Sequence, residues 1–167
     1  YIGLVLGAMR ADYFPRLSAV NHDNEQVCRL VNEQTEIALL LAGPIIIGMI
    51  CFMDVIVTLL YSAKFHQSVD VLLWLMIGNL LKVISWPMGF VPVAKNKAGW
   101  FIFTELLWNA LFLAGVWLSW NRLGLESIGI TFVVCYFIYN LIVFIICKKL
   151  SGFSLSIKNV QLIFNPK

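Results

Sequence analysis

A single lysine lies deep inside an apolar stretch of the sequence, where a charged side chain is costly. Lys82 is about 20 Å along a helix from the next lysine in the chain. Asn79, Lys82 and Trp86 are spaced so that they share one helix face. Pro87 follows at once, and its ring predicts a kink a few residues earlier, near residues 83–85. A cation beside a kink predicts a polar cavity that attracts an anion.

Two later apolar stretches carry polar residues at the same kind of spacing. Glu105 and Asn109 are four residues apart with Trp108 next to them, and Tyr136 and Asn140 repeat this interval. Residues four apart lie on the same face of a helix. Together with the lysine stripe, three successive helices are therefore expected to line one water-accessible interior surface.

Lys82 and Glu105 allow two interpretations. In the functional one they belong to a translocation pathway, in which the ammonium attracts an anionic substrate and the carboxylate tunes that binding or carries a proton. In the structural one they form a salt bridge between neighbouring helices. Their depths differ by about 8 Å, which two long side chains could nearly span. The sequence leaves both interpretations open.

Residues that commonly perform catalysis or bind metals are sparse and scattered. His22 and His66 are isolated, and four cysteines occur without a CxxC pair. The chain has no GxSxG, HExxH or glycine-rich phosphate loop. We therefore expect no catalytic residues, no metal site and no cofactor, which favours a transporter over an enzyme.

The composition is that of a membrane protein. Of 167 residues, 60% are hydrophobic and only 13% are charged, and the mean hydropathy is +0.86. Soluble domains carry about 25% charged residues, so too little polar surface remains for a water-soluble globule. A net charge of +3 without a basic cluster also argues against nucleic-acid binding.

Four stretches are long and apolar enough to cross a bilayer, which takes about 20 helical residues. We expect spans at residues 35–61, 69–94, 98–120 and 124–147, and the end of a preceding span at residues 1–17. Their short polar links predict an up-down bundle. The truncated apolar start predicts that the sequence is the C-terminal part of a longer protein.

Two segments outside these spans have mixed character. Residues 18–34 have apolar positions on one face and are expected to form an amphipathic link on the cytoplasmic surface. The alternative is a solvated continuation of the following span. Residues 148–167 are expected to form a cytoplasmic tail.

The basic residues indicate the orientation, because lysine and arginine are enriched on the cytoplasmic side. One side of the predicted bundle carries only Lys64 and Arg122. The other carries nine basic residues: Arg10, Arg16, Arg29, Lys95, Lys97, Lys148, Lys149, Lys158 and Lys167. This bias predicts that both ends of the four-span unit are cytoplasmic.

Four segments resemble a known transporter family. These are ADYFPRLSAV (residues 11–20), LVNEQTEIALLLAGPIIIG (30–48), LLYSAKF (59–65) and LLKVISWPMGFVPVAK (80–95). In order and spacing they resemble the C-terminal half of bacterial O-antigen translocases, the Wzx-type flippases of the multidrug/oligosaccharidyl-lipid/polysaccharide exporter superfamily. Pro15 and Ser18 match a pattern that closes a helix on the cytoplasmic side. Around them the resemblance implies a cytoplasmic gate motif: Arg10, Asp12, Pro15, Arg16 and Ser18.

The resemblance implies a fold and an activity. Such exporters have two lobes around a central cavity, and this chain would be part of the second lobe. They flip undecaprenyl-diphosphate-linked O-antigen units across the bacterial inner membrane. The implied partners are this lipid-linked oligosaccharide and membrane lipids, with a polysaccharide polymerase and a chain-length regulator beside them. The implied substrate pathway contains Asn79, Lys82, Trp86, Glu105, Trp108, Asn109 and Asn140.

We therefore predict an all-α polytopic transmembrane helical bundle that belongs to a lipid-linked oligosaccharide flippase. One alternative is a multidrug or cation exporter of the same superfamily, although Lys82 disfavours a cationic substrate. Another alternative is a membrane-embedded glycan-processing enzyme, which would need a large loop or a cluster of histidine, aspartate or arginine. A structural membrane subunit is a third alternative.

Overall fold

The computed structural model is entirely helical over the residues that it describes, 2–61 and 67–153. Predictions for residue 1, for the loop with Lys64 and His66, and for the tail with Lys158 and Lys167 lie outside these residues. The all-α prediction is confirmed. The helices are α1 (Ile2–Ala19), α2 (Asn24–Cys51), α3 (Met53–Tyr61), α4 (Gln67–Gly89), α5 (Val91–Ala94), α6 (Ala98–Leu123) and α7 (Glu126–Ser151).

Four helical stretches are long and apolar enough to cross a membrane. They are Asn24–Cys51, Val69–Ala94, Ala98–Leu123 and Glu126–Ser151. Large apolar side chains cover the outside of α6, where Trp117 is 79% exposed and Leu118 is 71% exposed. Exposure of such an apolar surface to water is unfavourable, whereas contact with lipid tails is not. The predicted number of complete spans is confirmed.

The segment after α1 continues into the first span. Residues 24–34 form the opening turns of α2, so this segment and the following span are one continuous helix. Asp23 begins α2 by accepting hydrogen bonds from the backbone amides of Glu25 and Gln26 at 3.0 and 3.1 Å. After this N-cap no residue interrupts the helix until Cys51.

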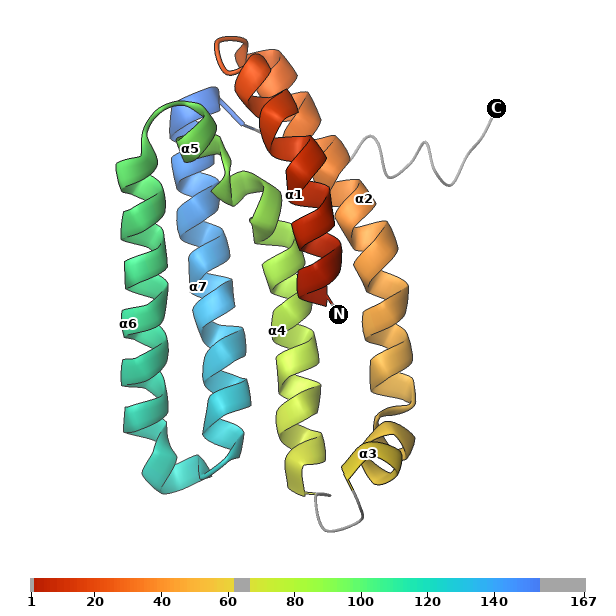
Figure 1. The fold of residues 1–167 in the computed structure, drawn as a ribbon. Helices are drawn as coiled ribbons and strands as arrows, with labels where there is room; N and C mark the ends of the chain where they lie inside the picture. The colour runs from red at the N-terminus through yellow and green to blue at the C-terminus, as the bar shows by residue number, and fades with distance from the viewer. Residues whose placement is uncertain (1, 62–66, 154–167) are drawn as a thin grey trace.

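The helix that carries the predicted span at residues 35–61 ends before residue 61. The helix stops at Phe52, and α3 begins at Met53 as a separate helix. The Phe52 amide bonds back to the carbonyls of Gly48 and Ile50, which closes α2. In Figure 1 α3 lies across the end of α2 and does not extend it. The hydropathy of residues 52–61 indicated burial in apolar surroundings but not the direction of the chain.

Helix α7 packs between α4 and α6 and makes the most extensive contacts in the bundle (Figure 1). Glycines allow the close approach. A Cβ built on Gly129 of α7 would lie 2.6 Å from the Cβ of Trp74 on α4. A Cβ on Gly115 of α6 would lie 2.5 Å from the Thr131 methyl group of α7. Small residues at helix crossings serve this purpose in membrane bundles.

The chain turns after α4 at a point held by α1. The helix continues through Pro87 to Gly89 and is interrupted at Phe90, after the expected site near residues 83–85. The hydroxyl group of Tyr13 donates a hydrogen bond to the Pro87 carbonyl at 2.9 Å. The Pro87 carbonyl also accepts the Phe90 amide at 3.3 Å, so the buried Tyr13 hydroxyl is a second donor to this carbonyl near the break.

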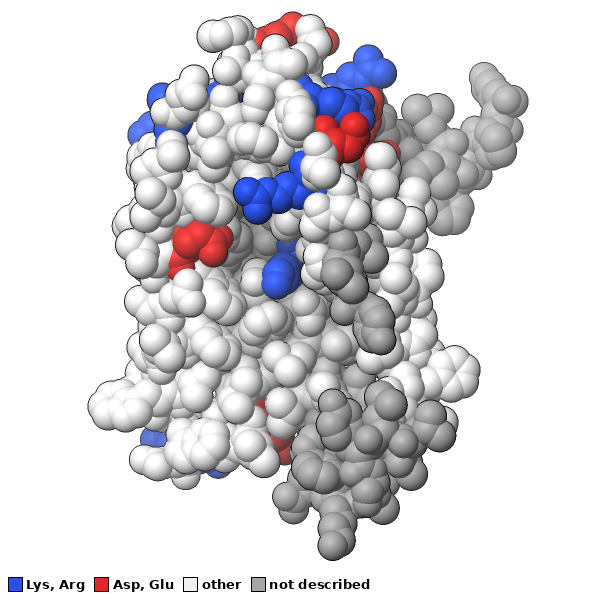
Figure 2. All heavy atoms as spheres, viewed as in Figure 1, with Lys and Arg blue, Asp and Glu red and all other residues white. Residues whose placement is uncertain are grey.

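Basic residues gather at one end of the bundle, which we call the basic end. It consists of the turn between α1 and α2, helix α5, the start of α6 and the end of α7 (Figure 1). The described basic residues near this end are Arg16, Arg29, Lys95, Lys97, Lys148 and Lys149. Arg10, which was predicted on the same side, lies midway along α1, and Arg122 lies near the opposite end. Figure 2 shows the same concentration of blue atoms. The predicted grouping of charge on one side thus agrees with the helix directions.

Candidate functional site

A polar cavity of about 430 Å³ lies among α4, α6 and α7. Figure 2 shows a hollow in this face with an acidic group over α6 and basic groups across from it. Five predicted pathway residues line it together. The full lining is Lys82, Ser85, Trp86, Gly89, Phe90, Phe101, Glu105, Trp108, Asn109, Phe132, Tyr136 and Tyr139.

Lys82 and Glu105 face the cavity without pairing to each other. Both side chains are half-buried, and the ion pairs within the described residues join Arg16 to Asp12 and Arg29 to Glu33. Glu105 instead accepts a hydrogen bond from the Tyr139 hydroxyl at 3.0 Å. The salt-bridge interpretation is therefore wrong for this conformation. The ammonium of Lys82 stays available to a ligand in the cavity.

An aromatic wall stands behind the acidic side of the cavity. The rings of Trp108 and Phe112 stack at 5.3 Å, and Tyr136 lies 5.2 Å from Trp108. Phe132 meets Trp108 edge to face at 6.0 Å. The indole Nε1 of Trp108 is buried and has no hydrogen-bond partner. Such a wall supplies flat apolar faces and one unused donor beside a carboxylate.

The basic side of the cavity is connected to α1 through aromatic contacts. Trp86 meets Phe90 edge to face at 5.2 Å and lies 5.9 Å from the Tyr13 ring. The Arg10 guanidinium stands 5.3 Å from the centre of the Phe90 ring. A second cation therefore lies next to a residue that lines the cavity, on the side of Lys82.

Two predicted pathway residues do not line the cavity. The Asn79 amide bonds to the Leu75 carbonyl of its own helix at 2.9 Å. The Asn140 amide donates to the Leu81 carbonyl of α4 at 2.9 Å and to the Tyr136 carbonyl at 2.8 Å. Asn140 thus ties α7 to α4. Neither residue lines this cavity, so a pathway role for Asn79 and Asn140 stays a prediction.

Asn109 does line the cavity and is exposed, with its amide bonded to the Glu105 carbonyl at 2.8 Å. Within the described part of the chain, its side-chain carbonyl oxygen accepts no hydrogen bond.

The proposed gate motif does not form one cluster. Asp12 and Arg16 pair with each other at 3.2 Å across one helical turn, with both side chains more than half exposed. Such a pair contributes little stability. Pro15 is exposed within α1, and Ser18 is half-buried next to the last residue of that helix. Only Arg10 reaches the surroundings of the cavity.

Tyr139 and Phe132 are site residues that the sequence reasoning missed. Tyr139 is three residues after Tyr136, so the same spacing rule that selected Tyr136 and Asn140 could have found it. Phe132 is four residues before Tyr136, but one aromatic residue in an apolar span carries no signal of a site. Only the contact with α4 and α6 reveals its position.

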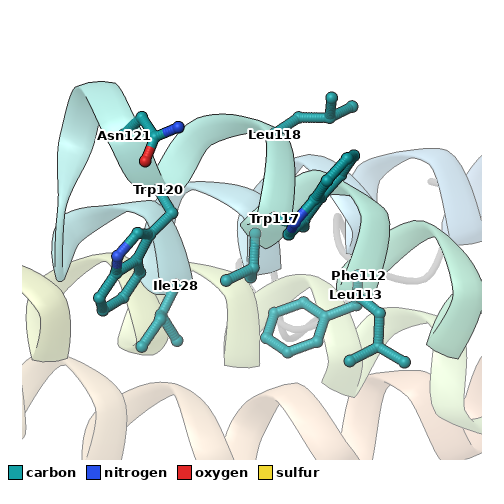
Figure 3. Close-up of a pocket in the computed structure, with 8 residues that line it drawn as sticks. Phe112, Leu113, Trp117, Leu118, Trp120, Asn121 and Ile128 are labelled. Atoms are coloured by element: carbon teal, nitrogen blue, oxygen red, sulfur yellow. The ribbon is translucent and has the colours of Figure 1, made fainter.

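A larger hollow of about 630 Å³ lies on the outer surface of α6 (Figure 3). The labelled side chains are Phe112, Leu113, Trp117, Leu118, Trp120, Asn121 and Ile128. Leu113 is 70% exposed there, and the lining has no charged group. Its chemistry is that of a lipid-facing surface near the end of a span, so we assign the functional role to the smaller polar cavity.

Four membrane-length helices, three of which line a polar cavity, define a multi-pass membrane protein. Residues 4–70 match the model of a family described as polysaccharide biosynthesis protein, from α1 to the start of α4. The match covers less than half of the chain and supports the broad part of the resemblance. Comparisons with curated proteins and with solved structures gave no match.

Proposed function

We propose that this chain forms part of a transporter that flips undecaprenyl-diphosphate-linked O-antigen or related polysaccharide units across the bacterial inner membrane. The match to a polysaccharide biosynthesis family and the four membrane-length helices support a polysaccharide-related transporter. The observation that carries the proposal is the half-buried, unpaired ammonium of Lys82 in a cavity that also contains tryptophan.

The substrate needs both chemistries of the cavity. A diphosphate is anionic, and an unpaired cation in a low-dielectric environment attracts it strongly. Arg10, over the Phe90 ring, adds positive charge on the same side. Sugars have apolar faces that stack on aromatic rings, and Trp86 and Trp108 supply such rings. Glu105 and Asn109 supply acceptors for sugar hydroxyl groups.

In the proposed mechanism this chain belongs to the second lobe, and the first lobe of the transporter completes the cavity. The diphosphate enters from the cytoplasmic side, the two lobes rock around it, and the glycan emerges on the other side. The basic end would face the cytoplasm under the positive-inside rule. The chain performs no covalent chemistry in this scheme and needs no cofactor. A polysaccharide polymerase and a chain-length regulator would then receive the product.

The test is the replacement of Lys82 in cells that express the full-length transporter. Lys82→Ala should reduce surface polysaccharide roughly tenfold or more, because hydrogen bonds to charged groups contribute about 1.5–3 kcal/mol. Lys82→Arg should retain part of the activity. Arg122→Ala, at the opposite end of the bundle, is the matched control and should be neutral. Normal surface polysaccharide in Lys82→Ala, at a normal level of protein in the membrane, would contradict the proposal.

The alternative of a cation exporter is tested by the acidic side of the same cavity. If the substrate is cationic, Glu105→Gln should abolish transport and Lys82→Ala should leave or improve it. The lipid-diphosphate proposal predicts the reverse ranking.

A further inference from the structure

A second groove lies between the start of α6 and the end of α7, at the basic end of the bundle. Its volume is about 470 Å³. Lys97 and Lys149 stand at its polar end with Trp100, and the apolar part includes Phe103, Ile142 and Ile145. It shares no lining residue with the cavity that contains Lys82.

The groove is open to the surroundings of the bundle. Phe103 is 51% exposed and Ile145 is 62% exposed, although both belong to membrane-length helices. Side chains at this position in a bilayer contact lipid. Figure 2 shows basic atoms at the corresponding upper end of α6 and α7.

The charge of the groove is not balanced by the protein. Lys97 and Lys149 are both exposed, and no acidic residue lines the groove. The ion pairs within the described residues involve neither lysine. The Lys149 ammonium is 6.0 Å from the centre of the Trp100 ring, which keeps it over the groove.

We propose that this groove binds an anionic phospholipid, with its phosphate between Lys97 and Lys149 and one acyl chain along Phe103, Ile142 and Ile145. Two unpaired ammonium groups favour a headgroup with net negative charge over a zwitterionic one. The apolar lining below them fits a hydrocarbon chain and no soluble anion. Trp100, at the boundary of the two parts, fits the interfacial position that tryptophan prefers. Basic pockets between membrane helices bind lipid headgroups in this manner.

The experiment is native mass spectrometry of the purified chain from mixed micelles. The micelles contain equal amounts of phosphatidylglycerol and phosphatidylcholine with identical acyl chains. Wild-type protein should retain phosphatidylglycerol in preference to phosphatidylcholine. Lys97→Gln and Lys149→Gln should each weaken this retention about fivefold, the effect of one lysine near an anionic lipid.

Lys148→Gln is the matched control, because Lys148 is exposed on the same turn of α7 but does not line the groove. It should retain phosphatidylglycerol like the wild type. Equal weakening in Lys148→Gln and Lys149→Gln would overturn the site, since it would indicate a diffuse surface charge. Equal retention of the two lipids by wild-type protein would also overturn it, and this comparison needs no variant. Displacement of the lipid by millimolar inorganic phosphate would show a site for a soluble anion and refute the lipid assignment.

Discussion

The close approach of α4 and α7 predicts that adding one methyl group at Gly129 destabilises the bundle. A Cβ at this position would lie 2.6 Å from the Cβ of Trp74 and 3.0 Å from the Val71 carbonyl oxygen. Neither atom can swing away, because one is backbone and the other is attached to it. Carbon atoms pack best at roughly 3.5–4.0 Å, so the helices must separate by about 1 Å. Overpacking of this kind costs about 1–3 kcal/mol.

The matched control is Gly48→Ala in α2. No atom lies within 4 Å of a Cβ built there, and alanine in a helix interior should be favoured over glycine by roughly 0.5–1 kcal/mol. Because this gain applies equally at the helical Gly129, Gly129→Ala should be less stable than Gly48→Ala by the overpacking cost alone, about 1–3 kcal/mol.

The assay is loss of helical circular dichroism in detergent micelles, with denaturant titration of wild type and both variants. The separation should also loosen the cavity, since Lys82 is on α4 and Tyr136 is on α7. If Gly129→Ala unfolds at the same denaturant concentration as Gly48→Ala, the parallel contact of α4 and α7 does not exist as described.

Three further changes test other contacts by the same unfolding measurement. Asn140→Leu removes the bond to the Leu81 carbonyl and should cost about 0.6 kcal/mol, the average for hydrogen bonds between membrane helices; a variant as stable as wild type would exclude that tie. Tyr13→Phe removes the bond to Pro87 and should cost about 1 kcal/mol, and no loss would show that α1 does not hold the break. Hydrogen bonds from the backbone and side-chain amides of Gln26 lower the pKa of Asp23 in the folded state. The ionised Asp23 cap therefore stabilises the fold fully above the pKa of the unfolded state, about 4, and this stabilisation is lost as the pH falls through the lower pKa of the folded state. Asp23→Asn should cap α2 without this acid dependence, and an equal acid loss in wild type and variant would refute the assignment.

Composition and residue spacing were sufficient to predict the class of protein and several of the residues that line the cavity. The number of membrane-length helices follows from the apolar stretches of about bilayer length, and these depend only on the local sequence. Lys82, Trp86, Glu105, Trp108 and Asn109 were predicted as pathway residues and do line one cavity. Each is a polar or amphipathic group in a span, where solvation alone restricts it to an interior surface.

The local sequence pattern did not reveal which group a polar side chain bonds to or where an apolar helix ends. Asn140 follows the same polar spacing as the cavity residues, yet its amide bonds to an α4 carbonyl. The break at Phe52 was invisible to hydropathy, because both sides of it are apolar. The spacing rule could have selected Tyr139, but only the packing of α7 against α6 shows that its hydroxyl bonds to Glu105.

The neighbours of each helix were decided by tertiary packing. Short links predict that consecutive helices run antiparallel, but the most extensive contact joins α4 and α7, which are not consecutive and run parallel (Figure 1). That contact depends on a glycine lying where the two helices approach closely, as Gly129 of α7 does beside Trp74 of α4. Helix formation and membrane burial are governed by nearby residues. Whether Lys82 meets Glu105 or an open cavity depends on how three helices fit together, and van der Waals contact among distant residues sets that fit.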